Sequence, residues 1–228
     1  MSVPAAGARR VGPPRRTRQH PAVAPTLRLI DREAWDRRHQ DKGFVWHLDP
    51  NRFLVPEVEG LTPGRALDLA AGAGRNAVWL AARGWAVTAV DWSEVAVDKG
   101  RRLAEHQAVR VEWVLADLQE WEPPGRAFDL VIVTYLQPPA DLRALVWRRA
   151  AEAVAEGGRL IVIGHDAANL VEGWGGPQDP AHLYTAQDVV DVVGAELEVV
   201  RAERVLRREE AEDGVHHAVD NVVVAVRR

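Results

Sequence analysis

The chain has 228 residues and a formal net charge of -4; 47% of its residues are hydrophobic and 27% are charged. These values are typical of one globular domain, and a mildly acidic balance gives no general attraction to nucleic acid or anionic lipid. Cysteine is absent, which excludes disulfides, thiolate metal sites and cysteine nucleophiles, and which fits a reducing, cytoplasmic location.

The N-terminal part differs in composition from the rest of the chain. Residues 1–26 are rich in proline and arginine and show no apolar period, so we expect a flexible tail. Residues 27–228 are expected to form a single domain with a helical cap over about residues 27–60. Within that cap, Trp35 and Trp46 are predicted to form an apolar wall of the substrate site, although plain packing against the sheet would explain them equally well.

After the cap, short apolar runs alternate with helical segments. Such runs predict a mostly parallel sheet with helices on both faces. The polar stretch LRREEAEDGVHHA, residues 206–218, suits a hairpin better than a crossover, so the last strand should be antiparallel. The sequence thus predicts a doubly wound α/β domain. Its seven predicted strands are Ala66–Leu69, Ala86–Val90, Val111–Leu115, Asp129–Val133, Arg159–Gly164, Leu197–Val205 and Asn221–Val226.

Three aspartates lie at or near the ends of the first three predicted strands. They are Asp68, Asp91 and Asp117. Ligands of open parallel sheets bind beyond the carboxyl ends of the strands, so we expect the three side chains to project into one crevice. A single aspartate at a strand end is usually a turn or capping residue. Three of them in register with a Gly-x-Gly turn are hard to obtain by accident.

The turn after the first strand predicts a nucleoside ligand. Gly72 and Gly74 let the backbone approach a ligand closely, Asp91 is placed to accept hydrogen bonds from ribose hydroxyls, and Trp92 offers a flat face to a base. The pattern also reads as G-x-G-x-x-A, an acceptable but weak dinucleotide fingerprint. Asp68 favours a different ligand, because its charge would repel a pyrophosphate and attract a cation. S-adenosylmethionine fits, since it carries an ammonium group, a sulfonium group, ribose and adenine.

The stretch LDLAAGAGRNAVWLAARGWAVTAVDWS resembles the first two motifs of the class I S-adenosylmethionine-dependent methyltransferases, and most of all the tellurite-resistance and thiopurine methyltransferase branch. The resemblance implies a Rossmann-like methyltransferase fold with a seven-stranded sheet, and S-adenosylhomocysteine as product. It also implies that Asp68 lies near the methionine portion and that Asp91 holds the ribose. Asp117 would contact the adenine amino group, with the Leu118 backbone beside it.

One position departs from the D-x-G-x-G-x-G pattern of that family. Ala70 stands where the first glycine is expected, before Gly72 and Gly74. Alanine is tolerated there if its φ is negative. We therefore still expect Ala70 in the cofactor site, with slightly weaker binding and the same fold.

The loops after the fourth and fifth strands are predicted to carry the acceptor site. Thr134 and Tyr135 stand where members of the family touch cofactor and substrate; Tyr135 orients an acceptor or is simply a half-buried aromatic. The long loop after the fifth strand is typical of a functional segment, and Trp174 is expected to close over the pocket. His165 is the candidate general base, because its unperturbed pKa is about 6.5, with strand-end capping as the alternative. Asn169 is a candidate for binding the substrate.

The predicted function is methyl transfer from S-adenosylmethionine to a small-molecule acceptor, without a metal, a membrane or a nucleic acid. Two alternatives stay open. A nicotinamide-dependent oxidoreductase would use a similar crevice, although Asp68 and the absence of a lysine four residues after Tyr135 argue against it. A non-catalytic S-adenosylmethionine-binding protein is compatible too, because no single residue is required for proton transfer.

Overall fold

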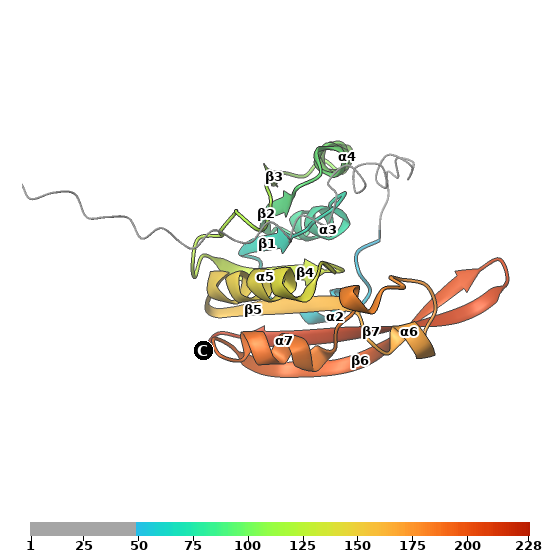
Figure 1. Cartoon of the computed structure of the whole chain (residues 1–228). Helices are drawn as coiled ribbons and strands as arrows, with labels where there is room; N and C mark the ends of the chain where they lie inside the picture. The colour runs from blue at the N-terminus through green and yellow to red at the C-terminus, as the bar shows by residue number, and fades with distance from the viewer. Residues whose placement is uncertain (1–48) are drawn as a thin grey trace, which may run out of the picture.

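The computed structural model describes residues 49–228. The expected tail, most of the expected helical cap, Trp35 and Trp46 lie outside the described residues and stay predictions. The centre of the molecule is a seven-stranded sheet in the order β3-β2-β1-β4-β5-β7-β6 (Figure 1). Strand β7 pairs antiparallel with both of its neighbours, and all other pairs are parallel. This confirms the predicted doubly wound sheet with its last strand antiparallel.

The parallel strands form where the sequence has short, continuously apolar runs. Such runs are buried on both faces of a parallel sheet. The strands are β1 (Arg65–Leu69), β2 (Ala86–Asp91), β3 (Val111–Leu115), β4 (Phe128–Thr134), β5 (Val154–His165), β6 (Glu198–Ala211) and β7 (Gly214–Val226).

Helices cover both faces of the sheet. Helices α5 and α7 pack on one face around Leu67, Val131 and Val162, while α2 and α3 pack on the other face around Ala66 and Ile132. Among the described residues no helix is long and apolar enough to span a membrane. The helices are α2 (Val55–Val58), α3 (Arg75–Ala81), α4 (Glu94–His106), α5 (Ala140–Ala153), α6 (Asn169–Glu172) and α7 (Ala186–Val193), with a 3-10 turn at Pro180–His182.

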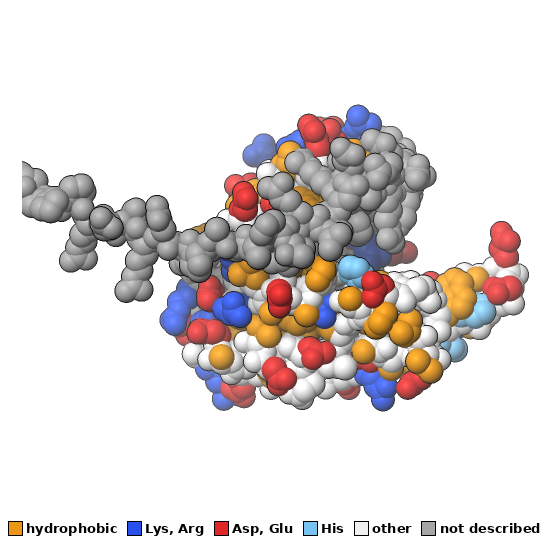
Figure 2. Space-filling model, viewed as in Figure 1, with side chains coloured by type: hydrophobic (Ala, Val, Ile, Leu, Met, Phe, Trp, Pro, Cys, Tyr) orange, Lys and Arg blue, Asp and Glu red, His pale blue; other side chains and the backbone are white. Residues whose placement is uncertain are grey.

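The hairpin of β6 and β7 is longer than predicted. Residues 206–218 do not form a link outside the strands; they continue both strands as far as the pair Ala211 and Gly214. The hairpin projects from the sheet (Figure 1), and Figure 2 shows acidic and histidine side chains near its tip. The prediction failed because this part is rich in charged and polar residues on an exposed ribbon and therefore has no buried apolar run. The extension brings Arg207 next to Asp220 on β7.

Candidate functional site

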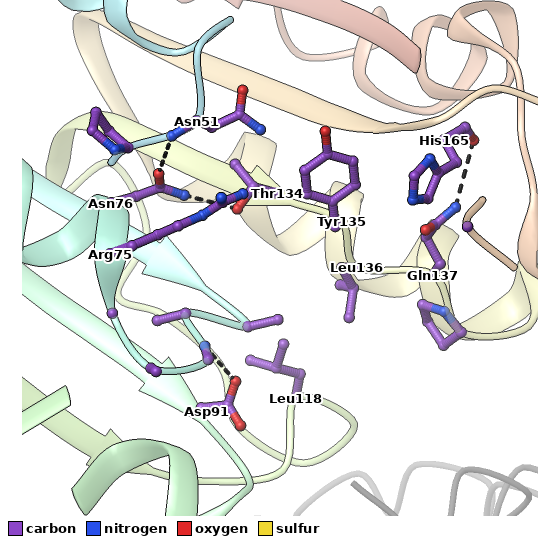
Figure 3. Close-up of a pocket in the computed structure, with 18 of the residues that line it drawn as sticks. Asn51, Arg75, Asn76, Asp91, Leu118, Thr134, Tyr135, Leu136, Gln137 and His165 are labelled. Carbon is purple, nitrogen blue, oxygen red and sulfur yellow. Dashed lines mark hydrogen bonds between the residues drawn. The ribbon is translucent and has the colours of Figure 1, made fainter. Parts of the chain in front are cut away.

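A pocket of about 1390 Å³ lies at the edge of the sheet where the parallel strands end (Figure 3). One half is formed by the turns after β1, β2 and β3, and the other half by the turns after β4 and β5 together with β6. The first half contains Ala70, Gly72, Gly74, Asp91, Trp92, Asp117 and Leu118; the second contains Thr134, Tyr135, Gln137, His165, Gly176 and Arg207.

Asp91 is fixed at the end of β2 by two backbone donors. The Gly72 N–H donates to its Oδ2 at 2.8 Å, and the Ser93 N–H donates to its Oδ1 at 2.9 Å. The side chain of Ser93 in turn caps α4 by accepting from Ala96 N. Each carboxylate oxygen has further lone pairs. Asp91 can therefore accept hydrogen bonds from hydroxyl groups at the pocket wall while it holds the glycine turn in place.

The glycine turn is shaped by a tryptophan beneath it. Gly74 has φ 77°, and a Cβ on it would lie 2.2 Å from the Trp113 ring; a Cβ on Gly100 of α4 would meet the same ring at 2.2 Å. Both positions therefore need glycine for space, and Gly74 also needs it for its backbone conformation. Trp113 thus supports the turn from below and leaves its upper side to the pocket.

Ala70 corrects the expectation about the missing glycine. Its φ is 57°, in the left-handed region, whereas the sequence prediction required a negative value. An L-residue with a Cβ pays about 1–2 kcal/mol there. The strain lies in the turn that lines the pocket.

We expect the substitution Ala70→Gly to stabilise the protein. Removal of the strain outweighs the roughly 0.4–1 kcal/mol that glycine costs through the unfolded chain. The net gain should be about 0.5–1 kcal/mol, or roughly 2–4 °C in Tm. The matched control is Ala71→Gly, since Ala71 does not have a positive φ and should lose stability. Equal losses in the two variants would show that Ala70 is not strained.

Asp68 does not lie where the sequence argument put it. It is the fourth residue of the five-residue strand β1, so alternation points its side chain to the same face as Ala66, under α3. The carboxyl group is fully buried, does not line the pocket, and neither oxygen has a hydrogen-bond partner in the described part of the chain. The expectation of three acids in one crevice is therefore wrong for Asp68; Asp91 and Asp117 do line the pocket.

Burial has a large effect on the Asp68 carboxyl group. Desolvation and the nearby charge of Asp91 raise its pKa to about 8, although Arg75 and the backbone N–H of Ala77 act in the opposite direction. Near neutral pH the group is therefore largely protonated in the structure described.

Asparagines that sequence reasoning missed connect three segments around the pocket. The Asn51 N–H donates to Asn76 Oδ1 at 2.9 Å, and Asn76 Nδ2 donates to Thr134 Oγ1 at 3.0 Å (Figure 3). Thr134 thus lies at the pocket wall, as part of a polar chain from the segment before α2 through α3 to β4. Next to Asn76, Arg75 lines the pocket and makes no ion pair within residues 49–228.

Tyr135 and His165 meet at the second half of the pocket. Their ring centroids are 5.0 Å apart. The Tyr135 hydroxyl donates to Asp220 Oδ2 at 2.7 Å, and its backbone has φ 55°. Burial and the charge of Asp220 raise the pKa of the Tyr135 phenol above its ordinary value. Tyr135 therefore acts as a hydrogen-bond donor and is unsuited to be a base.

Asn169 and Trp174 do not line the pocket. Asn169 is buried; its Oδ1 accepts from Val219 N at 2.7 Å and its Nδ2 donates to Gly175 O at 2.8 Å. Trp174 stacks on His216 of the hairpin, with centroids 4.7 Å apart. These contacts secure the loop after β5 to β7, so the structure gives both residues a scaffold position in place of the predicted substrate contact and closing lid.

The rest of that loop is held by a buried arginine. Arg143 donates to the carbonyl oxygens of Pro138 and Ala181 at 2.7 Å each and of Leu183 at 3.2 Å. A second contact joins the loops after β4 and β5: His182 Nδ1 lies 2.6 Å from the carbonyl oxygen of Gln137, at hydrogen-bond distance. The loops after β4 and β5 therefore form one braced unit around the pocket.

A sequence comparison matches part of the chain to a known family. The family described as "Methyltransferase domain" matches residues 66–158. Among curated proteins, demethylmenaquinone methyltransferase from Clavibacter sepedonicus is 31% identical over 123 residues, which are 52% of this chain and 46% of the relative. The match thus spans about half the length of that relative.

Solved structures resemble the chain over most of its length. A structure reported for the conversion of a disulfide bond into a thioacetal group in echinomycin biosynthesis has a TM-score of 0.64 and 21% identity, covering 86% of this chain and 91% of the other. TehB from Haemophilus influenzae has a TM-score of 0.65 and 16% identity, and the match covers 78% of this chain and 63% of TehB. Magnesium protoporphyrin IX methyltransferase from Synechocystis with bound SAH has a TM-score of 0.60 and 18% identity. The match covers 92% of this chain and 90% of that structure. At these identities the likeness concerns the fold.

Proposed function

We infer that this chain transfers a methyl group from S-adenosylmethionine to a small-molecule acceptor, on the premise that residues 66–158 form a methyltransferase domain of the class I, S-adenosylmethionine-dependent kind. The observation that carries the inference is the composition of the first half of the pocket. A glycine turn, a fixed carboxylate and apolar walls lie together within the segment that the family matches.

The first half of the pocket fits the donor chemically. Asp91 accepts hydrogen bonds from the ribose hydroxyls, Trp92 and Leu118 provide apolar surfaces for the adenine, and Asp117 lies beside them for its amino group. We assign the cofactor carboxylate to Arg75, which follows the glycine turn and lines the pocket. When bound, S-adenosylmethionine supplies an electrophilic methyl group with a good leaving group. The protein's part is to align donor and acceptor and to exclude water.

The second half of the pocket is assigned to the acceptor. It contains Tyr135, His165 and Gln137 beside the apolar surfaces of Leu136 and Pro138. We assign the general base to His165. We also propose the tellurite-resistance and thiopurine branch for this chain; the motif at residues 67–93 and the shared fold of TehB support that branch.

A thermal-shift panel tests the proposed function. S-adenosylhomocysteine at 100 times its Kd should add roughly 2.7 kcal/mol to the free energy of unfolding, about 5–10 °C in Tm for a chain of this size. NAD and NADP at the same concentrations should give no shift. The opposite pattern would identify a nicotinamide-dependent oxidoreductase. A shift with S-adenosylhomocysteine, together with no release of it from S-adenosylmethionine in an acceptor screen, would favour the non-catalytic binder.

A further inference from the structure

We propose that Asp220 is a positioning residue that holds His165 in the tautomer whose Nε2 accepts a proton, and hence that the methyl acceptor is a protic nucleophile, a thiol or a phenol-like hydroxyl. The inference rests on the proposed function and deepens it. Asp220 lies on β7, far along the chain from the motif at residues 67–93, and no local sequence pattern links it to His165.

The register of the sheet places the two residues side by side. His165, the last residue of β5, pairs with Asp220 across the antiparallel β5–β7 ladder, which directs both side chains to the same face. His165 Nδ1 lies 3.0 Å from Asp220 Oδ1. The two atoms face each other as a close pair, and neither has a hydrogen-bond partner elsewhere in the described part of the chain.

The second carboxylate oxygen of Asp220 is already occupied. Tyr135 Oη and Arg207 Nε each donate to Oδ2 at 2.7 Å, so Oδ1 remains for His165. Asp220 is fully buried. Burial acts to raise its pKa, but the contacts with His165, Arg207 and Tyr135 outweigh it and hold the pKa below its ordinary value. Asp220 is therefore ionised at neutral pH.

An ionised carboxylate only accepts hydrogen bonds, so the imidazole nitrogen that faces it carries the proton. In neutral His165 the lone pair is then on Nε2. On the far side of the ring, a Cβ on Gly176 would lie 3.1 Å from Nε2, Cε1 and Cδ2. The Gly176 backbone, with φ 74°, therefore packs closely against the imidazole ring. Because glycine has no side chain, it limits the movement of the ring without covering it. Both His165 and Gly176 line the pocket (Figure 3 labels His165).

The charged and titratable groups around the imidazole come from several elements. Asp220 faces it from β7 and Tyr135 from the end of β4. Arg207 on β6 is shared between Asp220 and Glu209, so its charge is balanced. His182 lines the same pocket, with its Nδ1 bonded to a backbone carbonyl. Among residues 49–228, the Asp220 carboxylate is thus the charged group in direct contact with the imidazole.

This arrangement determines the chemistry that the acceptor side supports. The acceptor's S–H or O–H proton passes to His165 Nε2, and the freed lone pair forms the new bond to the methyl carbon. The bond from that carbon to the sulfonium sulfur breaks, and the sulfur keeps the electron pair as a neutral thioether. The imidazolium, stabilised by Asp220, then returns its proton to solvent. An acceptor without a proton needs none of these groups.

Nitrogen NMR of the histidine rings in the full chain tests the positioning without any acceptor. In ¹⁵N-labelled protein, the His165 signals, assigned with His165→Asn, should report the tautomer with the proton on Nδ1. Asp220→Asn should remove that preference. The matched control is Asp213→Asn, because Asp213 contacts His216 Nε2 at 2.8 Å on the exposed hairpin; it should leave the His165 signals unchanged. A wild-type His165 with its proton on Nε2 overturns the proposal even if Asp220→Asn fails to fold.

Turnover tests the acceptor class. Probes are 2-mercaptoethanol and phenol, both protonated at neutral pH, and iodide, which has no proton. With a protic probe, His165→Asn should lower kcat by about 10²–10⁴ and Asp220→Asn by roughly 10–100-fold, with the S-adenosylhomocysteine thermal shift unchanged. Turnover with iodide but with neither protic probe, or wild-type kcat in His165→Asn, overturns the proposal. Loss of the thermal shift in the wild-type protein would instead refute the proposed function.

Discussion

Replacing Asp91 by alanine should lower the affinity for S-adenosylhomocysteine at least about 100-fold. A hydrogen bond to a charged group is worth roughly 1.5–3 kcal/mol, and Asp91 is assigned two of them with the ribose hydroxyls. The variant also loses the acceptor for the N–H groups of Gly72 and Ser93, which fix the glycine turn and the start of α4. We therefore expect a lower Tm and no ligand-induced shift in the same variant. Isothermal titration calorimetry at a temperature where the variant is folded measures the affinity.

The control for this variant is Asp129→Ala. Asp129 also accepts a backbone N–H, from Arg65 at 2.7 Å, but it lies near the start of β4, at the opposite end of the sheet from the pocket. Asp129→Ala should lose some stability and keep the wild-type affinity for S-adenosylhomocysteine. A folded Asp91→Ala protein that binds as tightly as the wild type would show that the ribose contact is misassigned.

Position in the chain determines how much of each half of the pocket could be predicted from sequence. Gly72, Gly74, Asp91 and Trp92 belong to one strand–helix–strand unit, where local spacing determines which residues meet. The second half depends on pairing between distant strands. Asp220 reaches His165 only because β7 inserts antiparallel next to β5, and a one-residue change of register would turn its side chain to the other face. No local pattern contains that information.

The strand predictions succeeded or failed for a related reason. Runs such as Phe128–Thr134 are apolar because both faces of the sheet are covered, so composition alone indicates a strand. The distal part of the hairpin has no such cover. Residues 206–211 are mostly charged and lie on an exposed ribbon, and their strand conformation depends on cross-strand partners that only the fold supplies.

Asp68 shows the limit of placing a side chain from a strand end. Its type and neighbourhood suggested an acid exposed to the ligand. The strand ends at Leu69, as predicted, but the two-residue period of the strand turns Asp68 under α3, a direction that the sequence argument did not take into account. An argument based on a charge at the pocket wall therefore does not hold for this residue. The assignment of a nucleoside cofactor rests instead on Asp91 and the residues beside it.

The substitution Asp68→Asn should stabilise the ligand-free protein, and increasingly so as the pH rises. The folded pKa of about 8 lies well above the ordinary value of 3.8. Between these values the folded protein holds a proton that the unfolded chain has lost, so wild-type stability falls with pH by up to about 1.4 kcal/mol per pH unit. Below pH 3.8 the wild-type protein keeps the full stability that the protonated Asp68 allows, and above about pH 8 that contribution is lost completely. Asparagine has a similar shape and does not titrate.

Between pH 5 and pH 8 the advantage of Asp68→Asn over the wild type should therefore grow by about 4 kcal/mol, or roughly 10 °C in Tm. Urea or thermal unfolding of both proteins across that range measures the difference, in which the other titrating groups cancel. Asp129→Asn, at a carboxylate that is 43% exposed, is the control for replacing an aspartate by asparagine outside the core. A parallel pH dependence for Asp68→Asn and the wild type would mean that burial under α3 does not raise the pKa of the Asp68 carboxyl group.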